Sequence, residues 1–253
     1  MSNFANKIVF ITGATSGIGK ACAEQFSAIG AKLIITGRRL DRLEQLRDEL
    51  DTDAQILNFD VCDREAVNTA IVNLPPEWQA IDVLVNNAGL AAGLDTIVDA
   101  DPNDWDQMID TNIKGLLSVT QAILPGMLER QRGHVLNISS IAGLEVYPKG
   151  NVYCATKFAV RALSQGLKMD CHGSPIRVTD IAPGAVETEF SNVRFKQDTQ
   201  KADSVYHGFQ PLAADDIANA VVYAATRPAH VDIRELVITP TAQSAATMIH
   251  RDI

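Results

Sequence analysis

The chain has few cysteines, and none of them is placed for a disulfide framework or a zinc site. Cys22, Cys62, Cys154 and Cys171 are widely spaced without a Cys-x-x-Cys pair, and the five histidines are scattered. Structural metal sites and disulfide-rich scaffolds need close, regular spacings of these residues. The sequence therefore predicts no bound metal, reduced thiols and a cytoplasmic protein.

Long hydrophobic runs and an excess of positive charge are also absent. The apolar run Ile8–Ile11 follows a single lysine and leads at once into a glycine-rich turn, so this segment resembles neither a signal peptide nor a membrane span. The formal net charge of -9 argues against a general surface for nucleic acid or anionic membranes. We therefore expect no nucleic-acid or membrane partner, and a small-molecule partner instead.

The length and the hydrophobic pattern predict one α/β domain over residues 1–253. Of these residues 46% are hydrophobic, which suffices for a sizeable core. Segments of helical periodicity alternate with seven apolar runs of strand length, which are Ile8–Ile11, Leu33–Ile35, Ile56–Phe59, Ile81–Val85, Val135–Ile138, Ile176–Ile181 and Leu236–Ile238. This alternation predicts a Rossmann-type, doubly wound parallel seven-stranded sheet with helices on both faces and ligands at the carboxyl ends of its strands.

Two further helices have clear signals. Asp101-Pro102 has the form of an N-cap followed by a first-turn proline, and predicts a long helix that ends near Pro125-Gly126. The second covers about 152–171. This helix carries a stripe of small residues, namely Ala155, Ala159, Ala162 and Gly166. Such a stripe suits close packing against another subunit or against the sheet of its own subunit.

Two segments predict a dinucleotide site that prefers NADP to NAD. The first is the turn Thr12–Gly19, where glycines after the first strand let backbone amides and a helix N-terminus approach a diphosphate. The second follows the next strand, where Arg38 and Arg39 stand in the region that commonly offers an acidic side chain to the ribose. Arginine binds an extra phosphate through paired hydrogen bonds. The alternatives are an ordinary strand-to-helix turn and two solubilising arginines.

Tyr153 and Lys157 are spaced for proton-transfer chemistry, with Ser140 thirteen residues before the tyrosine. Side chains four apart on a helix share a face, so the ammonium would favour the tyrosinate and lower the pKa of Tyr153. Two ordinary surface residues of a helix would have the same spacing, so this pair is not decisive alone.

Taken together, these segments resemble the short-chain dehydrogenase/reductase family, and the resemblance covers nearly the whole chain. The segments that match its motifs are Thr12–Gly19, Asp60-Val61, Asn86–Gly89, the set Asn112, Ser140, Tyr153 and Lys157, and Pro183–Thr188. The resemblance implies that NADP(H) is held by Gly13, Thr15, Ser16, Gly17, Ile18, Gly19, Arg38, Arg39, Asp60, Val61, Asn87, Ala88, Gly89, Tyr153, Lys157, Pro183, Gly184, Val186 and Thr188.

The resemblance also implies a catalytic role for four residues. Ser140 would donate a hydrogen bond to the substrate oxygen and Tyr153 would move the proton. Lys157 would lower the pKa of the tyrosine and hold the nicotinamide ribose, and Asn112 would hold a water that extends the proton relay. Strand alternation disfavours the neighbouring Ser139. Asn86 and Asn87 would be architectural, or a simple turn.

Within the family, three stretches resemble the NADP-dependent 3-hydroxy acid dehydrogenases, which oxidise serine and allo-threonine and reduce malonic semialdehyde. They are Asn86–Leu94, Leu124–Arg130 and Glu189–Phe195. The implied activity interconverts L-serine, L-allo-threonine or 3-hydroxypropionate with 3-oxo acids in a homotetramer. Two other functions stay open, which are an NADPH-dependent carbonyl reductase of larger apolar ketones and a non-catalytic NADP-binding regulator.

A 3-hydroxy acid carries a carboxylate, so its pocket needs a cationic or amide-rich anchor away from the reacting carbon. Arg194 is the candidate, with Lys149 and Lys196 as rivals. Arg194 falls in a polar segment around 188–210 that we expect to act as a substrate lid. The alternative is a solvated arginine on a mobile loop.

Overall fold

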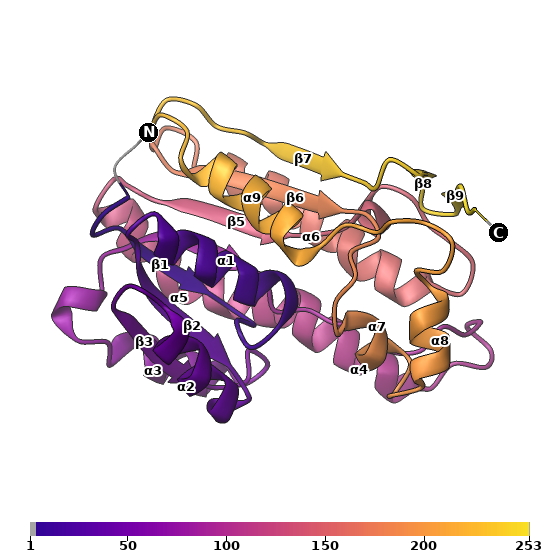
Figure 1. Ribbon diagram of the computed structural model, residues 1–253. Helices are drawn as coiled ribbons and strands as arrows, with labels where there is room; N and C mark the ends of the chain where they lie inside the picture. Colours follow the sequence, from indigo (N-terminus) through magenta and orange to yellow (C-terminus); the bar gives the residue numbers. More distant parts are fainter. Residues whose placement is uncertain (1–3, 253) are drawn as a thin grey trace.

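The structure, a computed structural model, describes residues 4–252 and contains a parallel sheet between two layers of helices (Figure 1). The sheet order is β3-β2-β1-β4-β5-β6-β7, with every neighbouring pair parallel. The strands are β1 Ile8–Ile11, β2 Lys32–Gly37, β3 Ala54–Asn58, β4 Ile81–Asn86, β5 His134–Ile138, β6 Arg177–Pro183 and β7 Glu235–Ile238. The predicted fold and all seven predicted strands are confirmed. The sequence did not reveal the short antiparallel pair β8 Gln243–Ala245 and β9 Met248–Ile249.

The helices alternate with the strands as predicted. They are α1 Gly17–Ala28, α2 Leu40–Glu49, α3 Arg64–Val72, α4 Pro102–Ile109, α5 Leu116–Glu129, α6 Asn151–Asp170, α7 Phe190–Arg194, α8 Thr199–Ser204 and α9 Ala214–Ala225. A π-helical turn, Asp110–Gly115, joins α4 to α5 and makes one long element of them. Turns of this kind are frequent at functional sites.

The predicted end of the long helix at Pro125-Gly126 is wrong. The helix accommodates Pro125 and continues to Glu129. It continues because Met127, on the next turn, is fully buried against the sheet, and this packing outweighs the local effect of the proline. The chain leaves the helix at Gln131, whose φ of 50° lies in the left-handed region.

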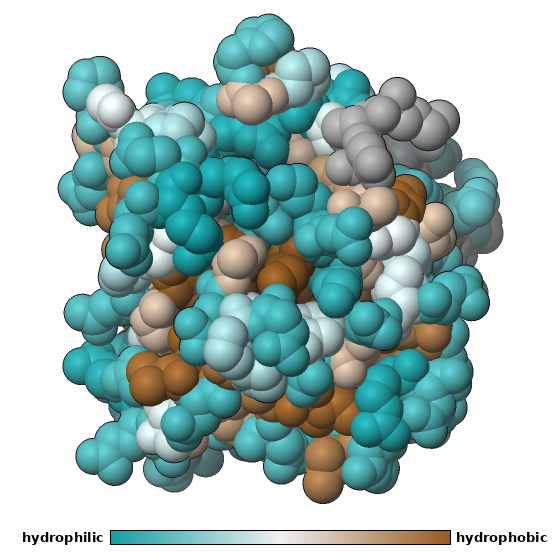
Figure 2. Space-filling view, turned by 90° about the vertical axis from the view of Figure 1, so that its left-hand side faces the viewer, coloured by the Kyte–Doolittle hydropathy of each residue, from teal (hydrophilic) through white to brown (hydrophobic). Residues whose placement is uncertain are grey.

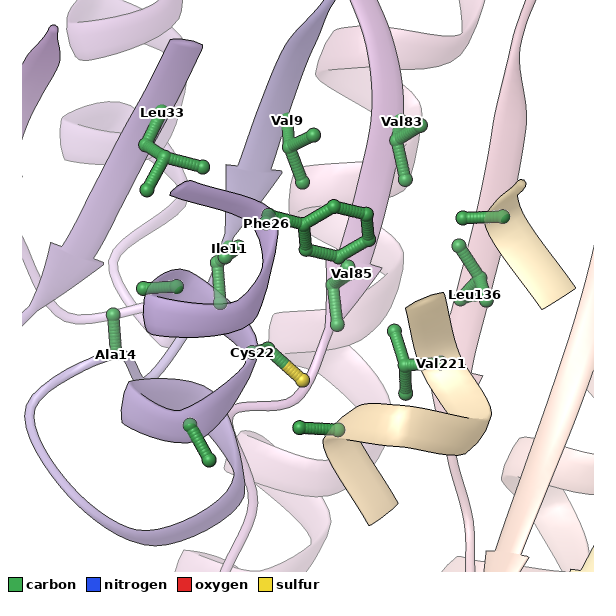
Figure 3. Close-up of a cluster of buried hydrophobic side chains, with 14 of the residues drawn as sticks. Val9, Ile11, Ala14, Cys22, Phe26, Leu33, Val83, Val85, Leu136 and Val221 are labelled. Carbon is green, nitrogen blue, oxygen red and sulfur yellow. The ribbon is translucent and has the colours of Figure 1, made fainter. Parts of the chain in front are cut away.

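One face of the sheet packs against α1, α2 and α9. Figure 3 shows Phe26 and Cys22 of α1 and Val221 of α9 against Val85 and Leu136 of the central strands. All five side chains are fully buried. Burial of a large apolar side chain is worth about 1.5–3 kcal/mol, so this layer is a main source of stability.

The other face packs against α3, α5 and α6. Val119, Ile123 and Met127 of α5 meet Phe10 and Leu84, which point away from the first layer. Side chains of successive strand residues alternate between the two faces, so the continuous apolar runs of the central strands serve both layers.

The small-residue stripe of α6 lies on the outside of the molecule. Ala155 and Ala162 are exposed, Ala159 and Gly166 are half-buried, and a Cβ on Gly166 would meet no atom within 4 Å. The sheet-facing side of α6 carries Tyr153, Thr156, Lys157, Val160 and Ser164, all buried. The alternative that the stripe packs on its own sheet is therefore wrong.

The strand order reverses between β1 and β4, which run side by side while the chain continues outward in both directions. At such a switch point the loops after the two strands separate and leave a crevice. The turn after β1, the Asn86–Gly89 segment after β4 and the loops after β5 and β6 all meet at this carboxyl edge. The predicted site residues are thus brought to one place.

Other features of the described chain bear on partners. No helix within residues 4–252 is long and apolar enough to cross a membrane. In the same range no group of three or more His, Cys, Asp or Glu side chains is arranged to hold a metal ion. All four cysteines are free thiols. Figure 2 shows the side of the molecule that lies at the left of Figure 1, where the strands of the sheet begin; hydrophilic side chains predominate there and hydrophobic ones form smaller patches between them.

Candidate active site

A cavity of about 690 Å³ lies at the carboxyl edge of the sheet. It extends from Arg38 and Asp60 past the glycine turn to Tyr153 and Arg194. Of the predicted cofactor residues, all but Gly19 line it. Gly19 is buried beside the turn, and a Cβ there would overlap the carbonyl oxygen of Gly13 and the side chain of Asn87. Gly19 therefore allows close packing of α1 against the turn, and its contact with the cofactor stays a prediction.

The glycine turn is locked to the loop after β4 by Thr12 and Asn87. The Thr12 hydroxyl accepts hydrogen bonds from the backbone nitrogens of Asn87 and Ala88 at 3.0 and 2.9 Å. The Asn87 side chain donates to the carbonyl oxygens of Thr12 and Gly13 at 2.9 and 3.1 Å. Gly13 and Gly17 have φ of 67° and 52°, which L side chains rarely adopt. This agrees with the predicted architectural role of Asn87 and leaves the turn open toward the cavity.

Arg38 and Arg39 lie at the far end of the cavity, with different surroundings. Arg38 is 63% exposed and approaches Asp60 at 3.4 Å. Arg39 is held more firmly, because it donates to the Thr15 hydroxyl at 2.7 Å and to the Ser16 hydroxyl at 3.0 Å. The two guanidinium groups therefore flank the glycine turn in the position that the sequence predicted.

Asp60 is charged at neutral pH. Burial works against its ionisation, but hydrogen bonds from Cys62 and the charge of Arg38 outweigh that effect and hold its pKa below the ordinary value. An ionised carboxylate next to Arg38 orients that side chain along the cavity wall.

Ser140, Tyr153 and Lys157 meet at the other end of the cavity. Ser140 follows β5 and donates to the Pro183 carbonyl oxygen at 3.3 Å, while its oxygen accepts from the Ala142 backbone at 3.1 Å. The Lys157 ammonium lies 5.8 Å from the centre of the Tyr153 ring and donates to the Ile138 carbonyl oxygen at 3.0 Å. The neighbouring Ser139 donates to Ile181 within the sheet. The predicted trio is thus assembled from β5 and α6.

Burial decides the ionisation of Tyr153 and Lys157 in the protein alone. It raises the pKa of Tyr153 well above its usual range, and the nearby Ser140 hydroxyl and the charge of Arg194 offset only part of this. Burial also lowers the pKa of Lys157 to about 8. This differs from the predicted lowering of the tyrosine pKa, because two groups sealed from water both favour their neutral forms. Lys157 can therefore stabilise the phenolate of Tyr153 only while it keeps its own proton.

Asn112 lies on the π-helical turn, but its side chain has structural partners. Its amide oxygen accepts from the Leu90 backbone nitrogen at 2.8 Å, and its amide nitrogen donates to the Leu90 carbonyl oxygen at 2.8 Å and to the Thr156 hydroxyl at 3.0 Å. Asn112 therefore joins the loop after β4 to α6. The water that it was expected to hold stays a prediction.

Arg194, on α7, lies over Tyr153. Its guanidinium carbon is 5.7 Å from the centre of the Tyr153 ring and 5.4 Å from that of Tyr147. Nε donates to the Gly93 carbonyl oxygen at 3.2 Å, whereas Nη2 is buried and has no partner among the described residues. A buried donor without a partner is costly, and a bound anion would remove that cost.

The two rival anchors are placed differently. Lys196 is 61% exposed and pairs with the largely buried Asp104 at 3.0 Å, and this carboxylate raises the pKa of Lys196. Lys149 is exposed in a turn with a φ of 65°. Of the three cations proposed, Arg194 is the one aimed into the large cavity.

Sequence reasoning missed several residues that build this site. Glu189 pairs with Arg39 at 3.1 Å and with Arg42 at 2.8 Å, so it links the 188–210 segment to α2. Phe190 packs edge-on against Tyr153, with ring centres 5.7 Å apart. The ring of Tyr147 packs against the guanidinium group of Arg194. No local pattern singles out these side chains, because their partners are more than thirty residues away in the chain.

The chain is similar to known dehydrogenases over nearly its full length. Residues 7–199 match the family model described as short chain dehydrogenase. The NADP-dependent 3-hydroxy acid dehydrogenase YdfG of Escherichia coli (strain K12) is 49% identical over 246 residues, 96% of this chain and 99% of the relative. Serine 3-dehydrogenase of Rhizobium radiobacter is 46% identical over 94% of this chain and 95% of the relative.

Solved structures give the same result. The closed form of serine dehydrogenase complexed with NADP+ has a TM-score of 0.93 and 49% identity, and covers 97% of this chain and 100% of that one. Serine dehydrogenase from Escherichia coli has a TM-score of 0.83 and 45% identity over 94% of this chain and 99% of that one. The sheet order, the glycine turn and these similarities together show that the chain belongs to the short-chain dehydrogenase family.

Proposed function

We propose that the protein is an NADP-dependent oxidoreductase that interconverts small 3-hydroxy acids, such as L-serine, L-allo-threonine and 3-hydroxypropionate, with 3-oxo acids. The observation that carries the proposal is the buried, unpaired Nη2 of Arg194 above the ring of Tyr153. A carboxylate bound there would hold a short hydroxy acid with its alcohol near the phenol. The names of the relatives, which specify 3-hydroxy acids or serine, support the same substrate class.

The residues around the cavity fit NADP. The cavity of about 690 Å³ has the glycine turn in its middle and two arginines at its far end, where a third phosphate needs cationic donors. When bound, this cofactor accepts or returns the hydride. We assign the extra phosphate to Arg38 and Arg39, the diphosphate to the turn Gly13–Gly19, and the nicotinamide end to Lys157 and the Pro183–Thr188 segment.

The chain's own groups move the proton. In oxidation, the Tyr153 phenolate takes the proton of the substrate hydroxyl, and in reduction the phenol returns it to the developing alkoxide. Ser140 lies beside Tyr153 and donates a second hydrogen bond to the same oxygen. Lys157 stabilises the phenolate as long as the ammonium keeps its proton.

The segment 188–210 is proposed as a lid. It contains α7 and α8, and its contacts with the rest of the chain are mostly polar. They include the Gly93 backbone donating to the Arg194 carbonyl oxygen at 3.0 Å, the pairs of Glu189 with Arg39 and Arg42, the pair of Lys196 with Asp104, and Arg251 donating to the Val205 carbonyl oxygen at 3.0 Å. Such contacts are weak enough to open and close during turnover.

Replacement of Arg38 should lower the affinity for NADP but not the affinity for NAD. We expect Arg38→Ala to weaken NADP binding about 10- to 150-fold, because one charge-assisted phosphate contact is worth about 1.5–3 kcal/mol, and to leave NAD binding nearly unchanged. The matched control is Arg47→Ala, since Arg47 is an exposed arginine of α2 paired with Asp48. Equal losses for NADP and NAD on titration of the variant would contradict this assignment.

The substrate class is tested by paired substrates that differ in one group. L-serine should be oxidised at least about ten times more efficiently than 2-aminoethanol, which lacks the carboxylate. A preference for large apolar ketones over both would favour the carbonyl reductase instead. The test measures nicotinamide absorbance under identical cofactor concentrations.

We also infer a homotetramer in the cytoplasm. Free thiols suit a reducing compartment. The outward small-residue stripe of α6 lies beside Phe158, which is 39% exposed, and α5 exposes 41% of Leu117 on the same side of the sheet. Sedimentation equilibrium should give about four times the 27.4 kDa chain mass, and Ala159→Arg should lower it; a monomeric wild type would contradict the inference.

A further inference from the structure

A row of polar residues crosses the sheet beneath α5 and α6. Asn86, Asn137, Asp180 and Glu235 are register partners on four neighbouring strands, β4 to β7. Asn86 donates to Thr120 of α5 and to Asn137, and Asn137 donates to Ser164 of α6. The row therefore lies on the face that α6 covers, which is also the face of Lys157.

Asp180 is the exceptional member of this row. It is 3% exposed, and neither carboxylate oxygen has a hydrogen-bond partner among the described residues. The nearby Ser139 hydroxyl is directed to the Ile181 carbonyl oxygen at 3.1 Å. A buried carboxylate without donors destabilises a fold, so packing gives no reason for it. Its distinctive contribution is a negative charge inside the protein.

The charges around Asp180 show where that charge acts. Lys157 and Arg161 approach from α6 and Glu235 from β7. Glu235 already engages Arg161 through two bonds of 2.8 and 3.2 Å. Lys157 has no carboxylate within 4 Å in the described structure, and a carbonyl oxygen is the partner of its ammonium. The charge of Asp180 therefore has Lys157 as its one uncompensated cation.

We infer that Asp180 is a positioning residue for catalysis, whose buried charge keeps the proton on Lys157 so that Tyr153 can act as the base. This inference rests on the proposed roles of Tyr153 and Lys157. In the singly deprotonated pair, the proton lies either on Lys157, which leaves a phenolate, or on Tyr153, which leaves a neutral amine. The first form alone contains the base. A negative charge nearer to the ammonium than to the phenol favours it.

The ionisation of Lys157 and Asp180 agrees with this assignment. Burial lowers the pKa of Lys157 to about 8, and Asp180 is the carboxylate that opposes this effect. Burial raises the pKa of Asp180 itself to about 6, so the carboxylate is charged above that pH. The charge thus acts on the lysine at the neutral pH where the enzyme would work.

The Asp180→Asn variant distinguishes a role in catalysis from a role in stability, because the two predict opposite changes in melting temperature. A carboxyl whose pKa is raised in the folded state destabilises the protein as pH rises through the interval between its unfolded and folded values, here from about 4 to about 6. Removing the charge should therefore raise the melting temperature at pH 7 by about 2 to 5 °C. The oxidation rate should nevertheless fall, roughly ten-fold, because without the charge of Asp180 the ammonium of Lys157 loses its proton more readily and the form that contains the phenolate is less populated.

The test is an ultraviolet titration of the tyrosinate, which needs no substrate. Wild type and Asp180→Asn are each compared with the same protein carrying Tyr153→Phe, so that the difference reports Tyr153. We expect the phenolate to appear at higher pH in Asp180→Asn, because Lys157 has then already lost its proton. In Asp180→Asn, the alkaline limb of the pH–rate profile for oxidation should also move to lower pH. The matched control is Asp82→Asn, because Asp82 is also a buried strand carboxylate and pairs with Lys7 and Arg132. This substitution should change neither the tyrosinate titration nor the alkaline limb of the pH–rate profile.

Two results would overturn the inference. One is an unchanged tyrosinate titration in Asp180→Asn, and the other is a lower rate that accompanies a lower melting temperature with an unmoved limb. Failure of the proposed function is distinguishable, because there the wild type would show no turnover that depends on Tyr153, whatever the titration gives.

Discussion

Tyr153→Phe should lower turnover roughly 10³-fold while the affinity for NADP changes little, since general acid–base groups contribute about 10²–10⁴-fold. The substitution removes one hydroxyl from a side chain that is 9% exposed and packed against Phe190. The ring stays, so the packing and the cavity shape are retained. In the proposed mechanism this hydroxyl takes the substrate proton and passes it on.

The control for this variant is Tyr223→Phe, because Tyr223 lies on α9, is 51% exposed and packs on Arg227 away from the cavity. It should leave both turnover and binding unchanged. Single-turnover kinetics and a cofactor titration on the three proteins separate the outcomes. A Tyr153→Phe protein that binds NADP normally and keeps its rate would show that another group is the base, whereas a wild type that binds NADP without any turnover would favour the non-catalytic regulator.

The second large effect concerns Arg194. Arg194→Met should reduce kcat/KM for L-serine about 10- to 150-fold, mainly through KM, because it removes the charge-assisted hydrogen bonds to the carboxylate and keeps the apolar stem. Activity on an uncharged ketone should change little. Arg194→Lys should recover only part of the loss, since a point charge does not reproduce the planar fork of guanidinium.

The matched control for Arg194 is Lys196→Met. Lys196 lies two residues further along the same segment and pairs with Asp104 at the surface. Its replacement should leave KM for serine unchanged. If both variants lost the same activity, the effect would come from movement of the segment, and Arg194 would no longer be the carboxylate anchor.

The elements that the sequence predicted correctly share a local cause. The seven strands are continuous apolar runs because both faces of the sheet are covered, and Thr12–Gly19 follows a strand directly, which fixes its place in the fold. Tyr153 and Lys157 need one turn of helix to be brought together, and α6 supplies it. Periodicity and short spacing are sufficient for such features.

The features that were not predicted depend on contacts between distant segments. Pro125 ordinarily ends a helix, but the burial of Met127 under the sheet carries α5 past it. The outward direction of the α6 stripe follows from which side of the helix the sheet takes. Asp180 is an acidic residue within an apolar strand, and its importance appears only when the register places it beneath α6.

The raised pKa of Tyr153 has the same origin. Spacing alone predicted an ammonium next to a phenol, and hence a lowered pKa. Burial of both groups reverses that direction in the protein alone, since desolvation of the phenol exceeds the help from its neighbours. Burial is a property of the whole fold, so a four-residue spacing cannot reveal it.

The most direct test of the central claim is the rate of nicotinamide reduction with L-serine and L-allo-threonine, each offered with NADP and with NAD. We predict turnover with NADP that exceeds turnover with NAD at least about ten-fold and that disappears in Tyr153→Phe. No reduction of NADP by any 3-hydroxy acid, in a protein that binds NADP and reduces apolar ketones, would contradict the claim.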